Sequence, residues 1–262
     1  MRPELRIRRL SPSWNSDEGR AFCSGLQAFC AGLPAETVIE GRRNHLFRIH
    51  IDVAGRQEIV IKRFAVPHPL GRLLNTLRSS KALRSFDIAV RLLDLGVSTP
   101  EPLAAVETWK GLRTGAFYCC RWHTHWSRAR ELRADFDPRA EHATWALGVF
   151  IGHLHNLGVL HRDLSGGNVL VGGDPSTPLG VTFSLIDLNR IRFTSVGRRM
   201  GIANLAVLGH FHYTAQLLDG YCRERRLSPS WTCSRYETML GVRRLRDTIW
   251  SGTRPLRRTL GL

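Results

Sequence analysis

The sequence predicts an α+β protein of two lobes, in which a strand-rich first lobe precedes a mainly helical second lobe with a reduced C-terminal end. Five short segments of the first half combine β-branched and apolar residues between turn signals, whereas the second half places apolar residues at helical spacing. We expect a basic leader with a short helix at residues 1–36, an N-lobe at 37–122 and a C-lobe at 123–262. A cleft between two such lobes is the usual place for a ligand.

The start of the chain is basic and contains Pro and Ser, which favours a loose leader over residues 1–20. Residues 21–33 (AFCSGLQAFCAGL) have the spacing of a short helix with one apolar face. No apolar signal core follows the basic start, and no run approaches the roughly 18 to 20 apolar residues that span a bilayer. We therefore expect a cytoplasmic protein, held peripherally at a membrane if it meets one.

The N-lobe is expected to be a sheet with one inserted helix. The segments TVIE, HLFRIHID and EIVIKRF read as three strands, with turns at GRRN and AGRQ. Residues 79–95 place apolar side chains at helical spacing, and Gly96 ends that run. The segments PLAAVET and GAFYCCRW then read as two further strands.

The C-lobe is expected to begin with a long amphipathic helix over residues 140–157, closed by Gly158. The segments NVLV and VTFSLID read as two strands joined by the turn GGDPSTPLG, which predicts a hairpin. The last 70 or so residues look mainly helical.

Between the long helix and the hairpin, residues 161–171 read HRDLSGGNVLV, an arrangement typical of phosphotransferase catalytic loops. Phosphoryl transfer needs a carboxylate near the attacking hydroxyl and oxygen ligands for Mg²⁺. Asp163 is the candidate catalytic base, and Asn168 and Asp187 are the candidate metal ligands. The hairpin places Asp187, at the end of its second strand, beside Asn168, at the start of its first strand.

Lys62, on the third strand, is the candidate for binding nucleotide phosphates. Only three of the 38 basic Lys and Arg residues are Lys, so a Lys retained on a strand indicates a need for a compact ammonium group. Such a Lys is usually paired with an acid on the following helix. Asp87 is the first candidate, and Asp94 and Glu101 remain alternatives.

The turn between the first two strands is a weaker candidate for phosphate binding, because the chain has no G-x-G-x-x-G. Its sequence, EGRRNHLFRI, contains one glycine. Backbone amides around Gly41 and the side chain of Arg42 or Arg43 can contact phosphate, and the alternative is a plain basic turn.

The net charge of +16 and the isoelectric point near 10.9 favour binding to polyanions. The tail VRRLRDTIWSGTRPLRRTLGL mixes Arg with apolar residues, and it can rest on anionic lipid, bind glycan phosphates or stay solvated. Codon bias in a GC-rich genome is an alternative source of the Arg excess.

Two further patterns carry less information. The segment RRLSPSW occurs at residues 8–14 and 225–231, and Ser-Pro-Ser suits a helix entry at either place. Three His-x-His pairs, among them His153 and His155, suggest a metal site. Side chains two positions apart on a helix point in different directions, so we do not expect such a site.

The segments GRRNHLFRI, IVIKRF, LHNLGVLHRDLSGGNVLV and FSLIDLNRIRF, with Asn204 and Leu205 further on, resemble the bacterial lipopolysaccharide kinases. These Kdo and heptose kinases are a divergent branch of the protein-kinase-like fold. The resemblance implies transfer of the ATP γ-phosphate, with Mg²⁺, to a sugar of the lipopolysaccharide core glycolipid at the cytoplasmic face of the inner membrane. It implies the roles given above for Lys62, Asp163, Asn168 and Asp187, whereas the family commonly has Glu where this chain has Asp87.

The residues themselves favour a compact acceptor over a peptide. Ser165 stands where protein Ser/Thr kinases usually place Lys, Leu-Asn rather than Phe-Gly follows Asp187, and only 75 residues remain after it. A small RIO-like protein kinase and a non-catalytic pseudokinase-type binding protein stay as alternatives. Both Kdo and heptose fit as acceptor sugars, the oligomeric state stays open, and no nucleic-acid partner is expected.

Overall fold

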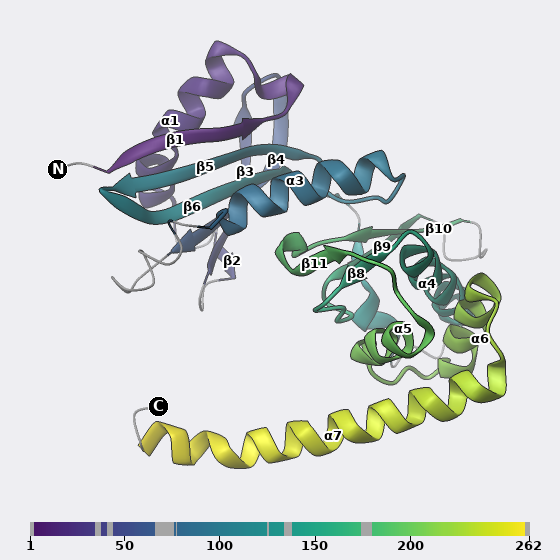
Figure 1. The fold of residues 1–262 in the computed structure, drawn as a ribbon. Helices are drawn as coiled ribbons and strands as arrows, with labels where there is room; N and C mark the ends of the chain where they lie inside the picture. Colours follow the sequence, from purple (N-terminus) through teal and green to yellow (C-terminus); the bar gives the residue numbers. More distant parts are fainter. Residues whose placement is uncertain are drawn as a thin grey trace. The chain divides into compact units, whose positions relative to one another are not determined.

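The computed structural model describes residues 3–34, 38–40, 44–65, 76, 78–124, 126–133, 138–173 and 180–259, which form two units (Figure 1). The N-terminal unit takes the chain up to His125 together with Leu185–Asn189, and the C-terminal unit takes Trp126–Ser184 and Arg190–Leu262. The segment Leu185–Asn189 was expected in the second lobe but clusters with the first.

The N-terminal unit is built on a six-stranded sheet in the order β1-β5-β6-β4-β3-β2, and neighbouring strands pair antiparallel. Five of these strands were expected from the sequence. The bounds are β1 Glu4–Leu10, β2 Val38–Glu40, β3 Asn44–Asp52, β4 Arg56–Ala65, β5 Pro102–Lys110 and β6 Leu112–Arg121.

The expectation of a loose leader is wrong, because residues 4–10 form the edge strand β1, which pairs with β5. The segment ELRIRRL alternates apolar and charged residues, as a half-buried strand does. Leu5 and Ile7 pack against the core, while Arg6 and Arg8 are exposed. The sequence contains this period-two pattern, but the basic charge of the segment led to the prediction of a loose leader instead of a strand.

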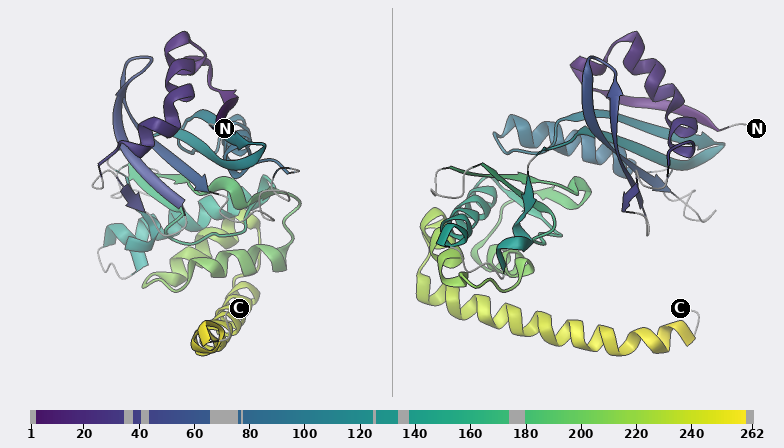
Figure 2. Two further views of the ribbon diagram at one scale, coloured as in Figure 1. Left: turned by 90° about the vertical axis from the view of Figure 1, so that its left-hand side faces the viewer. Right: turned by 180° about the vertical axis from the view of Figure 1, so that it is seen from behind.

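Helices cover both faces of this sheet (Figure 2). Helix α1 (Asp17–Ala31), capped by the Ser16 hydroxyl, packs its buried residues with those of β3 to β6 that face it. Helix α3 (Lys81–Asp94) covers the other face, where Ala82 and Phe86 meet alternate residues of β4 and β6. The helix expected at residues 79–95 is thereby confirmed.

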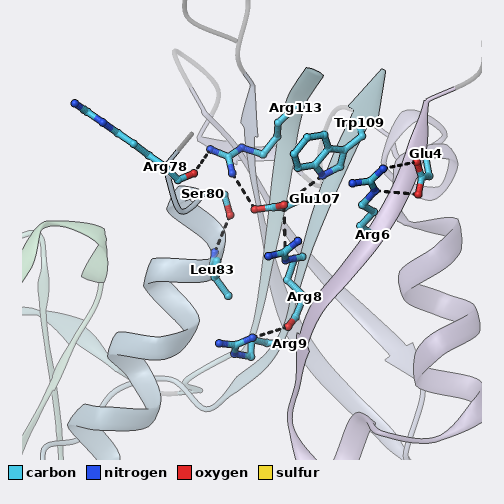
Figure 3. Close-up of polar contacts among 10 residues, drawn as sticks. All are labelled: Glu4, Arg6, Arg8, Arg9, Arg78, Ser80, Leu83, Glu107, Trp109 and Arg113. Carbon is cyan, nitrogen blue, oxygen red and sulfur yellow. Dashed lines mark hydrogen bonds and ion pairs between the residues drawn. The ribbon is translucent and has the colours of Figure 1, made fainter. Parts of the chain in front are cut away.

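A buried ion pair joins the sheet to the segment that precedes α3 (Figure 3). The Glu107 side chain is 2% exposed; its Oε1 accepts a 3.1 Å hydrogen bond from Arg113, and its Oε2 accepts one from Trp109 Nε1 at 3.2 Å. Arg113 also donates to the backbone oxygen of Arg78 at 2.6 Å. The pair therefore holds the entry to α3 against β5 and β6.

Replacing Arg113 with Leu should lower the free energy of unfolding by about 3 kcal/mol or more, because the Glu107 carboxylate loses its buried partner. Chemical denaturation of the full chain measures this change. The double variant Arg113→Leu with Glu107→Leu should regain most of the lost stability, because no unpaired carboxylate is left buried. If the double variant were as unstable as Arg113→Leu alone, the loss would not come from the unpaired Glu107 carboxylate.

The C-terminal unit combines helices with two small sheets, in the orders β10-β9-β7 and β11-β8. The expected long helix and the two strands of the expected hairpin are present, as α4, β9 and β10. No helix of the described residues is long and apolar enough to cross a membrane. The bounds are β7 Ser127–Arg128, α4 Pro138–Asn156, β8 Val159–His161, β9 Val169–Gly173, β10 Val181–Leu185, β11 Ile191–Phe193, α5 Arg198–Leu205, α6 Thr214–Arg225 and α7 Pro229–Thr259.

Helices α4 and α6 approach closely through two glycines. A Cβ atom on Gly148 would lie 2.1 Å from the backbone oxygen of Leu217, and one on Gly220 would lie 2.2 Å from that of Trp145. Each glycine therefore allows the opposite backbone to approach. This contact fixes α4, which leads into the candidate catalytic loop.

Both copies of the RRLSPSW segment enter a helix, as expected. Pro12 begins the 3₁₀ helix η1 (Pro12–Trp14), and Pro229 begins α7. In both copies the two serine hydroxyls are hydrogen-bonded, at 3.0 Å between Ser11 and Ser13 and at 3.1 Å between Ser228 and Ser230.

Candidate active site

Lys62 and Asp187 form an ion pair within the N-terminal unit, although they are 125 residues apart in the chain. Lys62 lies in the middle of β4, between Leu46 of β3 and Tyr118 of β6, on the face that α3 covers. Its Nζ donates to Asp187 Oδ1 at 2.5 Å, and Asn189 Nδ2 donates to the same oxygen at 2.8 Å. A cation suited to phosphate thus lies beside a carboxylate suited to a metal.

The backbone of Asp187 adopts the left-handed conformation, with φ of +56°. Non-glycine residues rarely take this conformation, and Asp tolerates it better than most. Two hydrogen bonds at Leu185 hold the chain just before it: Leu185 N–H donates to Ser98 O at 3.0 Å, and Thr99 Oγ1 donates to Leu185 O at 2.7 Å. Backbone held in a sparsely populated conformation often marks a functional residue.

The expected pairing of Lys62 with Asp87 is not what the structure shows. The Asp87 carboxylate accepts a 3.0 Å hydrogen bond from Arg9 of β1, and about half of the side chain is exposed. Glu101, an alternative partner, pairs with Arg121 at 2.8 Å. Asp94 is exposed, and no pair between it and Lys62 is seen in the described residues.

Asp163 lies in the loop after β8, within the C-terminal unit, and its side chain is 38% exposed. Its backbone N–H donates to His161 Nδ1 at 3.2 Å, which fixes the loop at its start. Arg190 Nη1 lies 3.4 Å from Asp163 Oδ2, and β11, which begins at the next residue, pairs with β8. No sequence motif singles out Arg190, because its contact with Asp163 depends on the pairing of two three-residue strands, β8 and β11.

Asn168 closes the same loop. Its Nδ2 donates to the Asp163 backbone oxygen at 2.8 Å, and its N–H donates to Ser165 O at 2.9 Å. With Nδ2 engaged in this way, the amide oxygen is the atom that a metal ion can reach. Gly166 is required by packing, because a Cβ there would lie 2.9 Å from the backbone of Arg130, whose N–H donates to Gly166 O.

The structure therefore brings the predicted residues together in two pairs, Lys62 with Asp187 in one unit and Asp163 with Asn168 in the other. The carboxylate of Asp187 and the amide oxygen of Asn168 are hard oxygen donors of the kind that Mg²⁺ prefers. Gly41 and Arg42 lie outside the described residues, so phosphate binding by that turn stays a prediction.

A buried hydrogen-bond network beneath the loop was not anticipated. Asn204 Nδ2 donates to the His161 backbone oxygen at 2.9 Å, which orients the amide so that its Oδ1 accepts from His155 Nε2 at 3.1 Å. His155 Nδ1 then accepts from the Tyr221 hydroxyl at 2.9 Å. This arrangement needs a neutral imidazole, and burial accordingly lowers the pKa of His155 to about 4. The network ties α4, α5 and α6 to the start of the catalytic loop.

His155 should make the protein less stable in acid. Its pKa falls from 6.5 to about 4 on folding, so the unfolded chain binds the proton more tightly and stability is lost as pH falls from about 6.5 towards 4. Between pH 7 and pH 5 this group should cost about 2 kcal/mol of unfolding free energy. Denaturation at both pH values, compared with His155→Gln, measures the contribution, and an unchanged pH dependence in the variant would contradict it.

Comparison with known proteins places the chain among kinases. The sequence model of the Lipopolysaccharide kinase (Kdo/WaaP) family matches residues 41–226, which is most of the chain. The solved structure of WaaP in complex with acyl carrier protein superposes with a TM-score of 0.55, covering 89% of this chain and 99% of that one at 19% identity. The expected α+β kinase-like fold is thereby confirmed.

One curated relative is also similar over part of its length. It is a probable bifunctional tRNA threonylcarbamoyladenosine biosynthesis protein of Methanothermobacter thermautotrophicus, 26% identical over 201 residues. The match takes in 74% of this chain, which spans only a third of that protein.

Proposed function

Since this chain belongs to the lipopolysaccharide kinase (Kdo/WaaP) family, a family of phosphotransferases, we propose that it transfers the γ-phosphate of ATP to a sugar hydroxyl of the lipopolysaccharide inner core. The acceptor sugar is Kdo or heptose. The observation that carries the proposal is the ion pair of Lys62 with Asp187, since it sets a phosphate-binding cation beside a metal-binding carboxylate.

Each residue has a distinct role in the proposed reaction. The Lys62 ammonium binds nucleotide phosphate oxygens, and Asp187 and Asn168 would hold Mg²⁺, which neutralises phosphate charge when bound. The oxygen of the acceptor hydroxyl forms a bond to the γ-phosphorus, and the bond from that phosphorus to ADP breaks. The Asp163 carboxylate accepts the proton that the hydroxyl loses. Arg190, 3.4 Å from that carboxylate, orients it.

The acceptor determines where the protein works. A core glycolipid is held in a membrane by its acyl chains, so we propose that the enzyme acts at the cytoplasmic face of the inner membrane. It would be bound peripherally there.

Mass spectrometry of the core glycolipid tests the proposal in cells with and without this gene. Loss of one phosphate from a core sugar, restored by the wild-type gene but not by Asp163→Asn, is the expected result. An unchanged glycolipid together with reduced phosphorylation of a protein would favour the RIO-like alternative instead.

A further inference from the structure

The second half of α7 exposes apolar side chains at positions where a solvated helix usually carries polar ones. In its first half, Thr232, Tyr236 and Leu240 recur every four residues and are buried against α5, α6 and the 3₁₀ turn η5 (Ala206–Leu208). Beyond Leu240, Val242 and Leu245 are 59% and 63% exposed, the highest values among the exposed large apolar residues of the described chain. Figure 1 shows this half of the helix extending past the rest of its unit.

The exposed apolar residues lie on one side of the helix. At 3.6 residues per turn, Val242 and Leu245 point away from the face that carries Tyr236 and Leu240. The sequence continues their spacing with apolar residues at positions 249 and 256. The family model matches residues 41–226, so α7 lies outside the matched residues.

Six Arg residues lie among the other positions of this half, together with one Asp and several uncharged residues. Arg244 and Arg246 are exposed, Arg243 is half-buried, and the sequence adds three more Arg before residue 259. A helix with an apolar stripe and an Arg-rich opposite face is the form that lies in the plane of a membrane interface. Such a helix is only marginally stable alone in water, and burial of its apolar stripe would stabilise it.

We propose that residues 242–259 of α7 lie on an anionic lipid bilayer. Val242 and Leu245 enter the boundary between head groups and acyl chains, and Arg244 and Arg246 pair with lipid phosphates. A nucleic acid would pair with the Arg residues but would leave the apolar stripe in water. A second copy of the chain would place two Arg-rich helices side by side, and their like charges would repel. The inference goes beyond the proposed kinase activity, because binding to lipid needs neither ATP nor an acceptor sugar.

Sedimentation of the full chain with vesicles tests the proposal, using phosphatidylcholine alone and phosphatidylcholine mixed with phosphatidylglycerol. The protein should bind the anionic vesicles, with helical content rising in circular dichroism, and should bind the neutral ones at least tenfold more weakly. Arg244→Gln with Arg246→Gln should weaken binding by about fivefold per Arg. The matched control is Arg56→Gln with Arg84→Gln, which removes the same charge from exposed positions elsewhere.

The apolar stripe needs its own variant. Val242→Gln with Leu245→Gln should weaken binding to anionic vesicles at least tenfold, whereas Val90→Gln with Leu93→Gln, at exposed positions of α3, should leave it unchanged. Equal binding by the stripe variant and its control would overturn the proposal, as would binding to nucleic acid with none to vesicles. Because these vesicles hold no glycolipid and no nucleotide, the result is independent of whether the kinase proposal holds.

Discussion

Replacement of Asp163 with Asn should lower the rate of phosphoryl transfer by about 10²–10⁴-fold, the range that general base catalysis contributes. Asn has nearly the size of Asp, and its amide oxygen can take the place of the carboxylate oxygen that lies 3.4 Å from Arg190. The loop should keep its shape, because its internal bonds use the Asp163 backbone and Asn168. What the variant loses is a carboxylate that can take the acceptor proton.

Steady-state kinetics with thermal unfolding measure this change. We expect kcat to fall while the KM for ATP and the melting temperature stay near wild type. Asp52→Asn, at an exposed position at the end of β3, is the matched control and should keep full activity. A rate for Asp163→Asn within a few-fold of wild type would show that another group accepts the proton.

Replacement of Asp187 with Asn should lower the rate by about 10²–10³-fold, in line with the several kcal/mol that metal-assisted charge neutralisation supplies. Asn tolerates the left-handed backbone found at this position, and its side-chain oxygen can still accept from Lys62. The variant therefore removes the charge that would hold Mg²⁺ without removing the conformation.

A magnesium titration separates this charge effect from a structural one. The Asn variant should need a much higher Mg²⁺ concentration for half-maximal activity, with little change in melting temperature. Asp187→Ala should in addition be less stable, since Ala is disfavoured at a φ of +56°. An Asn variant with wild-type magnesium dependence would remove Asp187 from the metal site.

The regular elements of this chain were predictable because each carries a local pattern. Short segments of β-branched and apolar residues between turn signals predicted β2 to β6, β9 and β10, and helical spacing predicted α3 and α4. β1 was missed because its charges suggested a solvated leader, although its apolar and charged residues alternate as in a half-buried strand. β8 and β11 are three residues each and form only by pairing with one another, so no local signal identifies them.

The site residues were found through motifs, whereas their supports depend on tertiary contacts. The partner of Asp87 is an example, because Arg9 comes from the segment expected to be loose. His155 stood out only as half of a His-x-His pair, yet it is held by Asn204 and Tyr221, which come from two other helices. A buried histidine next to a catalytic loop is recognisable only once those helices are packed.

The loop segment Ser165-Gly166-Gly167 also changes in meaning. Protein kinases often carry Lys-Pro-Glu at these three positions, so from sequence the whole segment favours a compact acceptor over a peptide. The glycine at position 166 is also explained by packing, since the Arg130 backbone leaves no room for a Cβ atom there. The case for a sugar acceptor therefore depends on Ser165 and on the family rather than on both glycines.

The central claim is that the γ-phosphate moves from ATP to a core sugar, and direct transfer by the purified full chain tests it. The protein is incubated with Mg²⁺ and γ-labelled ATP, and with either lipopolysaccharide core glycolipid lacking the core phosphate or a general protein substrate. Label on the glycolipid with the wild type, and none with Asp163→Asn, is the predicted result. Label on the protein substrate but never on the glycolipid, or transfer that persists in the Asn variant, would contradict it.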